Sequence, residues 1–163
     1  AGEYDAEGTL AAFDELYDAG KIDRVGVSNF EPRHLDEARK LLDAPLFANQ
    51  VEMHPLLQQE ELVSYAQEHD IALVAYSPLA RGKVFEVDEL TEIAEKHGVS
   101  EAQVSLAWLT GKENVVAIPK ASSDDHIEDN LAALDLELDD EDVAKIESID
   151  REQRQVDPGF APW

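Results

Sequence analysis

Four short apolar segments, each followed by a cluster of polar residues, recur along the chain. They lie at 24–30, 48–55, 72–79 and 115–122, and each begins with β-branched or aliphatic residues. Segments with helical periodicity separate them, so the pattern predicts alternating strands and helices in a parallel α/β sheet. Because such sheets form their sites at the carboxyl ends of the strands, the polar clusters are the candidate functional residues.

Apolar residues at helical spacing predict the helices between these strands. The first covers 9–19 and ends at Gly20, which supplies a stop signal. Residues 1–20 therefore form a loop and a crossover helix, and we expect the chain to begin in the middle of a βα unit. The other predicted helices are 31–42, 59–69, 88–97, 100–109, 124–134 and 140–149.

The length of the chain limits the architecture that these elements can form. A closed (β/α)₈ barrel typically needs about 250 residues, whereas this chain has 163 and contains four strand-plus-helix units. We therefore predict an α/β fold that is half of a (β/α)₈ TIM barrel. Residues 151–163 contain two prolines, a glycine and two aromatic residues, and are predicted to be an irregular tail.

The chain is strongly acidic, with 37 aspartates and glutamates, 13 lysines and arginines, and a net charge of −24. Such a field repels nucleic acid and anionic lipid, so we expect neither as a partner. The acids are spread along every helix, which favours a protein of a high-salt cytoplasm over an ordinary acidic cytosolic protein. With no cysteine, no signal peptide and no apolar run of membrane-spanning length, the sequence predicts a soluble, cytoplasmic chain.

Lys120 lies between the fourth predicted strand and the helix that follows it. It is the one cation other than histidine among eleven acids between positions 113 and 144. A strand end followed by a helix N-terminus, here with Ser122, is typical of an anion site, so we interpret Lys120 as a phosphate ligand. The alternative is a surface counter-charge. Asp124 and Asp125 oppose a phosphate placed close to the helix end.

Uncharged polar side chains follow the first three strands. Ser28 and Asn29 end the first strand and Gln50 lies within the second. Their hydroxyl and amide groups match a neutral carboxamide ligand, although Ser28 and Asn29 could instead cap the next helix. Tyr76 ends the third strand, where its ring could stack on a flat heterocycle and the loop through Gly82 could bind phosphate. The alternative for Tyr76 is a core tyrosine beside an ordinary loop.

The histidines do not have the spacing of a metal site, and no metal is expected. We interpret His34, His69 and His97 as solvated helix residues and His54 as a residue that orients a loop.

The strings at the strand ends resemble motifs of the aldo-keto reductase family. Residues 20–30 (GKIDRVGVSNF) are similar to GKIRxIGVSNF, 49–55 (NQVEMHP) to NQVEYHP, and 75–79 (AYSPL) to AYSPL, while 118–130 resemble IPKS followed by RIxEN. The resemblance covers nearly the whole chain, in order. It implies that residues 1–163 are the C-terminal half of a (β/α)₈ barrel that binds NADPH, or sometimes NADH, and reduces aldehydes and ketones.

The resemblance also implies three groups of cofactor-binding residues. The nicotinamide contacts are Ser28, Asn29, Gln50 and Tyr76. The residues along the pyrophosphate are Ser77, Leu79 and Gly82. The residues near the 2′-phosphate and the adenine are Lys120, Ser122, His126, Asp129 and Asn130.

The chain departs from the family pattern in two ways. His126 and Ala121 replace an arginine and a serine, which weakens recognition of the 2′-phosphate. The family's catalytic Asp, Tyr, Lys and His lie on the first half of the barrel, and Tyr4 does not match the motif of the catalytic tyrosine, so we expect no catalytic residue here.

The expected partners are a small carbonyl substrate and either a complementary N-terminal half or a second copy. The alternative is a non-catalytic nucleotide-binding or scaffolding module, such as a split-gene remnant or a regulatory barrel subunit.

Overall fold

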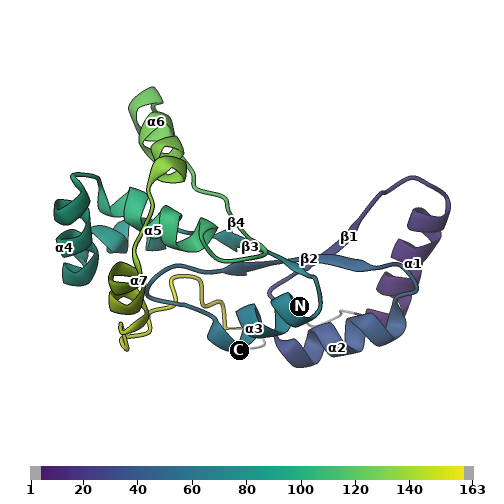
Figure 1. The fold of residues 1–163 in the computed structure, drawn as a ribbon. Helices are drawn as coiled ribbons and strands as arrows, with labels where there is room; N and C mark the ends of the chain where they lie inside the picture. Colours follow the sequence, from purple (N-terminus) through teal and green to yellow (C-terminus); the bar gives the residue numbers. More distant parts are fainter. Residues whose placement is uncertain (1–4, 160–163) are drawn as a thin grey trace.

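A computed structural model describes residues 5–159, so Tyr4 and residues 160–163 of the predicted tail lie outside the described part. The strands are β1 (Val25–Ser28), β2 (Leu46–Glu52), β3 (Ala72–Tyr76) and β4 (Val115–Ala117). They form one sheet in the order β1-β2-β3-β4, and every neighbouring pair is parallel (Figure 1). The prediction of four parallel strands in chain order is confirmed. The segments are shorter than predicted, because the polar residues at their ends leave the sheet.

The helices follow the predicted positions closely. They are α1 (Ala6–Asp18), α2 (Pro32–Leu41), α3 (Glu60–Glu68), α4 (Asp88–His97), α5 (Glu101–Thr110), α6 (Asp124–Ala132) and α7 (Asp140–Glu147). Two 3₁₀ segments, η1 (Ala80–Glu86) and η2 (Ala133–Asp135), were not predicted. None of the helices in the described part of the chain has the length and hydropathy that a membrane span requires.

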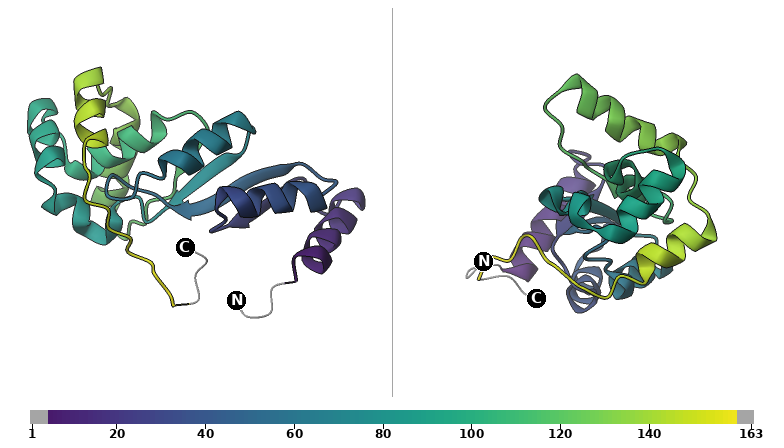
Figure 2. Two further views of the ribbon diagram at one scale, coloured as in Figure 1. Left: turned by 90° about the horizontal axis from the view of Figure 1, so that it is seen from below. Right: turned by 90° about the vertical axis from the view of Figure 1, so that its left-hand side faces the viewer.

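The two faces of the sheet differ in burial, as expected for half of a barrel. On one face, the register partners Asn49, Leu73 and Val115 are buried against the helices. The other face carries Ser28, Gln50, Val74 and Val116 in one row, of which Val74 alone is partly buried. Figures 1 and 2 show α2 and α3 along one side of the curved sheet. In a closed barrel the second face is the interior, where layers of side chains fill the space.

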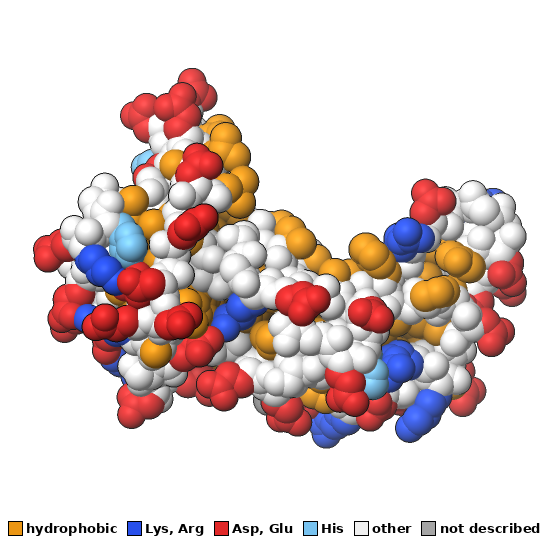
Figure 3. All heavy atoms as spheres, viewed as in Figure 1, with side chains coloured by type: hydrophobic (Ala, Val, Ile, Leu, Met, Phe, Trp, Pro, Cys, Tyr) orange, Lys and Arg blue, Asp and Glu red, His pale blue; other side chains and the backbone are white. Residues whose placement is uncertain are grey.

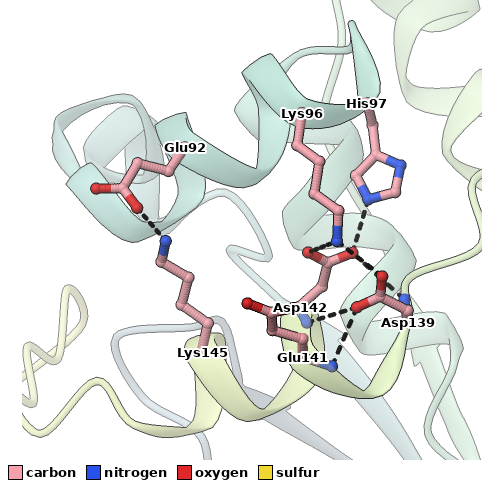
Figure 4. Close-up of polar contacts among 7 residues, drawn as sticks. All are labelled: Glu92, Lys96, His97, Asp139, Glu141, Asp142 and Lys145. Carbon is pink, nitrogen blue, oxygen red and sulfur yellow. Dashed lines mark hydrogen bonds and ion pairs between the residues drawn. The ribbon is translucent and has the colours of Figure 1, made fainter.

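An ionic network joins α4 to α7 (Figure 4). The Asp142 side chain is only 3% exposed, and its two oxygens bind Lys96 Nζ at 2.8 Å and His97 Nε2 at 2.6 Å. Lys96 also reaches Asp139 at 2.7 Å, and Lys145 pairs with Glu92. His97 was predicted to be solvated, which is wrong, because its ring is held against a buried carboxylate contributed by a distant helix.

Two carboxylates of this network, Asp142 and Asp139, have lowered pKa values. Burial alone raises the pKa of Asp142, but hydrogen bonds from Lys96 and His97 outweigh it, and the pKa is lowered. The hydrogen bond from Lys96 lowers the pKa of Asp139 to about 2. A carboxylate whose pKa is lower in the folded chain stabilises the fold above its unfolded pKa, and this contribution is lost as the pH falls.

We predict that Asp142→Ala lowers the free energy of unfolding by about 1.5–3 kcal/mol at pH 7, the range for hydrogen bonds to charged groups. The difference from the wild type should shrink as the pH falls below the ordinary pKa of an aspartate. Urea unfolding followed by circular dichroism measures both effects. Asp140→Ala, at an exposed position in the first turn of the same helix, is the control. Equal effects of the two substitutions would contradict the role of the network.

Candidate functional site

The backbone oxygen of Gln50 in β2 binds the end of β1 through two hydrogen bonds. The carbonyl of Gln50 accepts hydrogen bonds from Ser28 Oγ at 2.9 Å and from the amide of Asn29 at 2.9 Å. Neither residue caps α2, because the N-cap is Glu31, which forms a capping box with His34. The capping alternative for Ser28 and Asn29 is therefore wrong.

Tyr76 links the end of β3 to the end of β1 across the intervening strand. Its hydroxyl donates to Asn29 Oδ1 at 3.1 Å. Asn29 has a left-handed φ of 59°, which asparagine tolerates better than most residues. Within residues 5–159 the side-chain nitrogen Nδ2 of Asn29 has no hydrogen-bond partner, so it remains available to donate to a ligand.

Burial raises the pKa of the Tyr76 phenol, and the charge of Glu52 raises it further. Tyr76 is therefore a neutral donor at physiological pH, and its proton is directed to Asn29. The partly buried ring lies at the carboxyl end of the sheet, as the stacking hypothesis requires. Ser28, Asn29, Gln50 and Tyr76 are thus brought together, which is the arrangement predicted for the nicotinamide contacts.

Asn49 holds the loop after β1 and was not singled out from the sequence. It is fully buried, its Oδ1 accepts from the amide of Phe30 at 3.3 Å, and its Nδ2 donates to the carbonyl of Phe30 at 2.8 Å. The sequence feature that could have identified Asn49 is a polar residue at a strand position on the helix-facing side of the sheet. The Asn49 side chain thus pairs with both polar backbone groups of Phe30 and thereby fixes the position of the neighbouring Asn29.

The loop after β3 is tightly wound. Ser77, Ala80 and Arg81 have φ values of 50°, 47° and 52°, and Gly82 has 93°. For a non-glycine residue, the left-handed conformation costs about 1–3 kcal/mol, and residues strained in this way are found most often at functional sites. The amide of Gly82 already donates to Leu79 O at 2.8 Å, so Gly82 offers a bare Cα surface rather than an N–H group. The assignment of Ser77, Leu79 and Gly82 to the pyrophosphate stays a prediction.

Lys120, Ser122 and His126 are exposed, and within the described residues their side chains make no hydrogen bond or ion pair. Ser123, not Ser122, caps α6 by accepting from the amide of His126. Figure 1 shows that α6 projects away from the body of the molecule.

Asp129 is already occupied within the chain. Its carboxylate accepts from Ser100 Oγ at 2.8 Å and from Gln103 Nε2, and so holds the start of α5. Asn130 lines an apolar groove with Ile127 and Leu131. The assignment of Asp129 and Asn130 to the adenine stays a prediction. No cluster of three or more acidic or histidine side chains suited to a metal occurs among residues 5–159.

We predict that Asn49→Leu destabilises the chain by about 1–3 kcal/mol, because a buried hydrogen-bond pair to Phe30 is lost. Thermal unfolding measures this loss. Gln50→Leu is the control, since that side chain is exposed and the Gln50 groups that bind Ser28 and Asn29 are backbone. A change below about 0.5 kcal/mol for Asn49→Leu would show that the loop is held by other contacts.

Comparison with known proteins places these features in a family. The sequence pattern of the Aldo/keto reductase family matches residues 2–151. Glyoxal reductase of Bacillus subtilis is 42% identical over 146 residues, which are 90% of this chain and 52% of that protein. Methylglyoxal reductase DkgB of Escherichia coli is 36% identical over 162 residues, 98% of this chain and 60% of that protein.

The solved structures agree with the sequence comparison. An aldo-keto reductase crystallised with NADPH superimposes with a TM-score of 0.83 at 30% identity, and the match covers 92% of this chain and 49% of that one. The chain thus spans about half the length of the curated relatives that it matches. Its four parallel strands and outer helices correspond to part of the (β/α)₈ barrel of these enzymes. The chain belongs to the aldo/keto reductase family.

Proposed function

We propose that the chain is the cofactor-binding half of an NADPH-dependent reductase that converts small aldehydes and ketones to alcohols. The observation that carries this proposal is the convergence of Ser28, Asn29, Gln50 and Tyr76 at the carboxyl ends of three neighbouring strands. Family membership supports it, as do relatives named for the reduction of glyoxal and methylglyoxal.

The free groups of the site fit a nicotinamide carboxamide. Asn29 retains amide donors, and the exposed side chain of Gln50 offers both a donor and an acceptor. The Ser28 hydroxyl donates its hydrogen bond to Gln50 O, so towards a ligand it can act only as an acceptor. One carboxamide, with its own donor and acceptor, satisfies these groups together, and the Tyr76 ring would lie against the heterocycle.

The distal part of the cofactor is assigned to the segments after β3 and β4. We assign the pyrophosphate to Ser77, Leu79 and Gly82 and the 2′-phosphate to Lys120 and Ser122. Within the described residues Lys120 forms no ion pair with a carboxylate, which supports its role as a ligand of the 2′-phosphate. His126 and Ala121 supply weaker contacts than the family's arginine and serine, so we expect a modest preference for NADPH over NADH.

Bound NADPH supplies a hydride to the carbonyl carbon, and the residues of this chain hold and orient the cofactor for that transfer. The proton that the carbonyl oxygen then requires is not supplied by Tyr76, because its hydroxyl is directed to Asn29 and its pKa is raised. We therefore place the proton donor on a complementary N-terminal half. The outer edges of β1 and β4 are unpaired in the described chain and suit the strands of such a half.

We further propose that the protein works in a cytoplasm of high salt concentration. The net charge of −24 supports this, since dense carboxylates repel one another and a phosphorylated cofactor unless salt screens them.

We predict that the chain alone does not reduce glyoxal with NADPH at an enzymatic rate, because general-acid catalysis contributes about 10²–10⁴-fold and its donor is absent. A single polypeptide that joins the N-terminal half of Bacillus subtilis glyoxal reductase to this chain should oxidise NADPH when glyoxal is added. Absorbance at the NADPH band follows both proteins. A joined protein that folds and binds NADPH without turnover would instead support the non-catalytic nucleotide-binding module.

We predict that Lys120→Ala weakens NADPH binding to the joined protein by about 1.5–3 kcal/mol, the range for a hydrogen bond to a charged group, and leaves NADH binding nearly unchanged. Fluorescence titration with both cofactors measures the difference. Lys40→Ala, at an exposed position of α2, makes the same change in net charge and is the control. Equal weakening of both cofactors by Lys120→Ala would remove the 2′-phosphate assignment.

A further inference from the structure

The last residue of β2, Glu52, is a fully buried carboxylate with an unusual set of partners. Its Oε1 accepts from the backbone amide of Gln155 at 2.6 Å and lies 3.0 Å from His54 Nε2. Its Oε2 accepts from the amide of Val156 at 2.9 Å. Burial lowers the pKa of His54, so its neutral ring donates from Nε2 to the carboxylate. Three hydrogen-bond donors therefore satisfy the Glu52 carboxylate, which has no access to water.

Two of these donors belong to the segment that follows α7, more than a hundred positions away in the sequence. This segment has no regular secondary structure and runs from α7 as an extended chain (Figure 2). Arg151 pairs with Glu89 of α4, with NH1 at 2.8 Å from Oε1, and the amide of Gln153 donates to Leu56 O at 2.8 Å. The segment is thus fixed near α7 by a salt bridge, and at its far end by Glu52.

The far end of this segment lies beside the candidate nicotinamide contacts. Glu52 is the register partner of Tyr76, and the amide of Met53 donates to Tyr76 O at 3.3 Å. Arg154, between the anchored residues, lines the same cavity of about 620 Å³ as Asn29 and Leu56. The charges of Glu52 and Arg154 both act on the Tyr76 phenol, in opposite directions.

We propose that residues 153–156 form a strap that Glu52 holds across the carboxyl end of β2, and that Glu52 thereby positions one wall of the site beside Tyr76 and Asn29. The strap itself is defined by contacts within the chain, and only its role in cofactor binding rests on the proposed function. Both donors from the strap are backbone amides, so the anchor depends on the carboxylate and not on the side chains of Gln155 and Val156. Loss of that one group releases both donors together.

The first test is Glu52→Gln, which keeps the size of the side chain but replaces one acceptor oxygen with a donor that faces an N–H group. Hydrogen exchange measured by NMR should be at least about tenfold faster at the amides of Gln155 and Val156, and trypsin should cleave after Arg154 faster by a similar factor. Glu60→Gln makes the same change in charge at an exposed position of α3 and should leave both rates unchanged. Wild-type rates in Glu52→Gln would overturn the strap.

If Glu52→Gln does not fold, hydrogen exchange of the wild-type chain tests the strap instead. The amides of Gln153, Gln155 and Val156 should be protected from exchange relative to that of Glu152, for which the described chain offers no acceptor. Equal exchange at these four amides would overturn the proposal.

The second test separates positioning of the site from general stability. In the joined protein, Glu52→Gln should weaken NADPH binding severalfold and leave binding of adenosine 2′,5′-bisphosphate, which lacks the nicotinamide, unchanged. Equal weakening of both ligands, or of neither, would overturn the positioning role. If the wild-type joined protein binds neither ligand, then the proposed cofactor site fails, whereas the exchange and protease results still decide the strap.

Discussion

The backbone oxygen of Gln50 accepts two hydrogen bonds from the end of β1, and the position of the candidate site follows from this contact. It holds Ser28 and Asn29 at the level of β2, so that the Tyr76 hydroxyl from β3 can reach Asn29 across the middle strand. Parallel pairing aligns the carboxyl ends of the three strands at one edge of the sheet. Asn49 then fixes the direction in which the chain leaves β1, since it bonds both polar backbone groups of Phe30.

The acidity of the chain shapes where the remaining interactions lie. Several basic side chains are bound to carboxylates of other elements, as Lys112 is to Glu147 and Arg151 is to Glu89. Exposed pairs of this kind contribute little to stability, about 0–1 kcal/mol each. The buried carboxylates Asp142 and Glu52 differ, because each gathers donors from elements distant in the sequence. Each of these carboxylates therefore joins one of the last segments of the chain to the rest of the fold.

The sequence could predict the elements of this fold but not the contacts between them. The ends of α4 were predicted correctly because Asp88 begins an acidic first turn and Gly98 adopts the left-handed conformation that ends a helix. The 3₁₀ segment η1 was missed because Ala80 and Arg81 adopt positive φ values that their side chains rarely favour. The roles of His97 and Glu52 depend on partners more than forty residues away, which no local pattern indicates.

The open face of the sheet sets a physical requirement for whatever completes the barrel. Val116 and Ile118 are 53% and 44% exposed there, and Leu131 and Leu134, on α6 and in η2, are 63% and 66% exposed. Figure 3 shows the apolar side chains of this side as a band that continues from α6 over the sheet. Such a band favours burial against another apolar surface. A partner must therefore present both strand edges for β1 and β4 and apolar side chains for the interior, and this combination is what a second half-barrel offers. In such a complex, the proposed cofactor site and the proposed proton donor would lie on opposite halves, so that closing the barrel would itself assemble the active site.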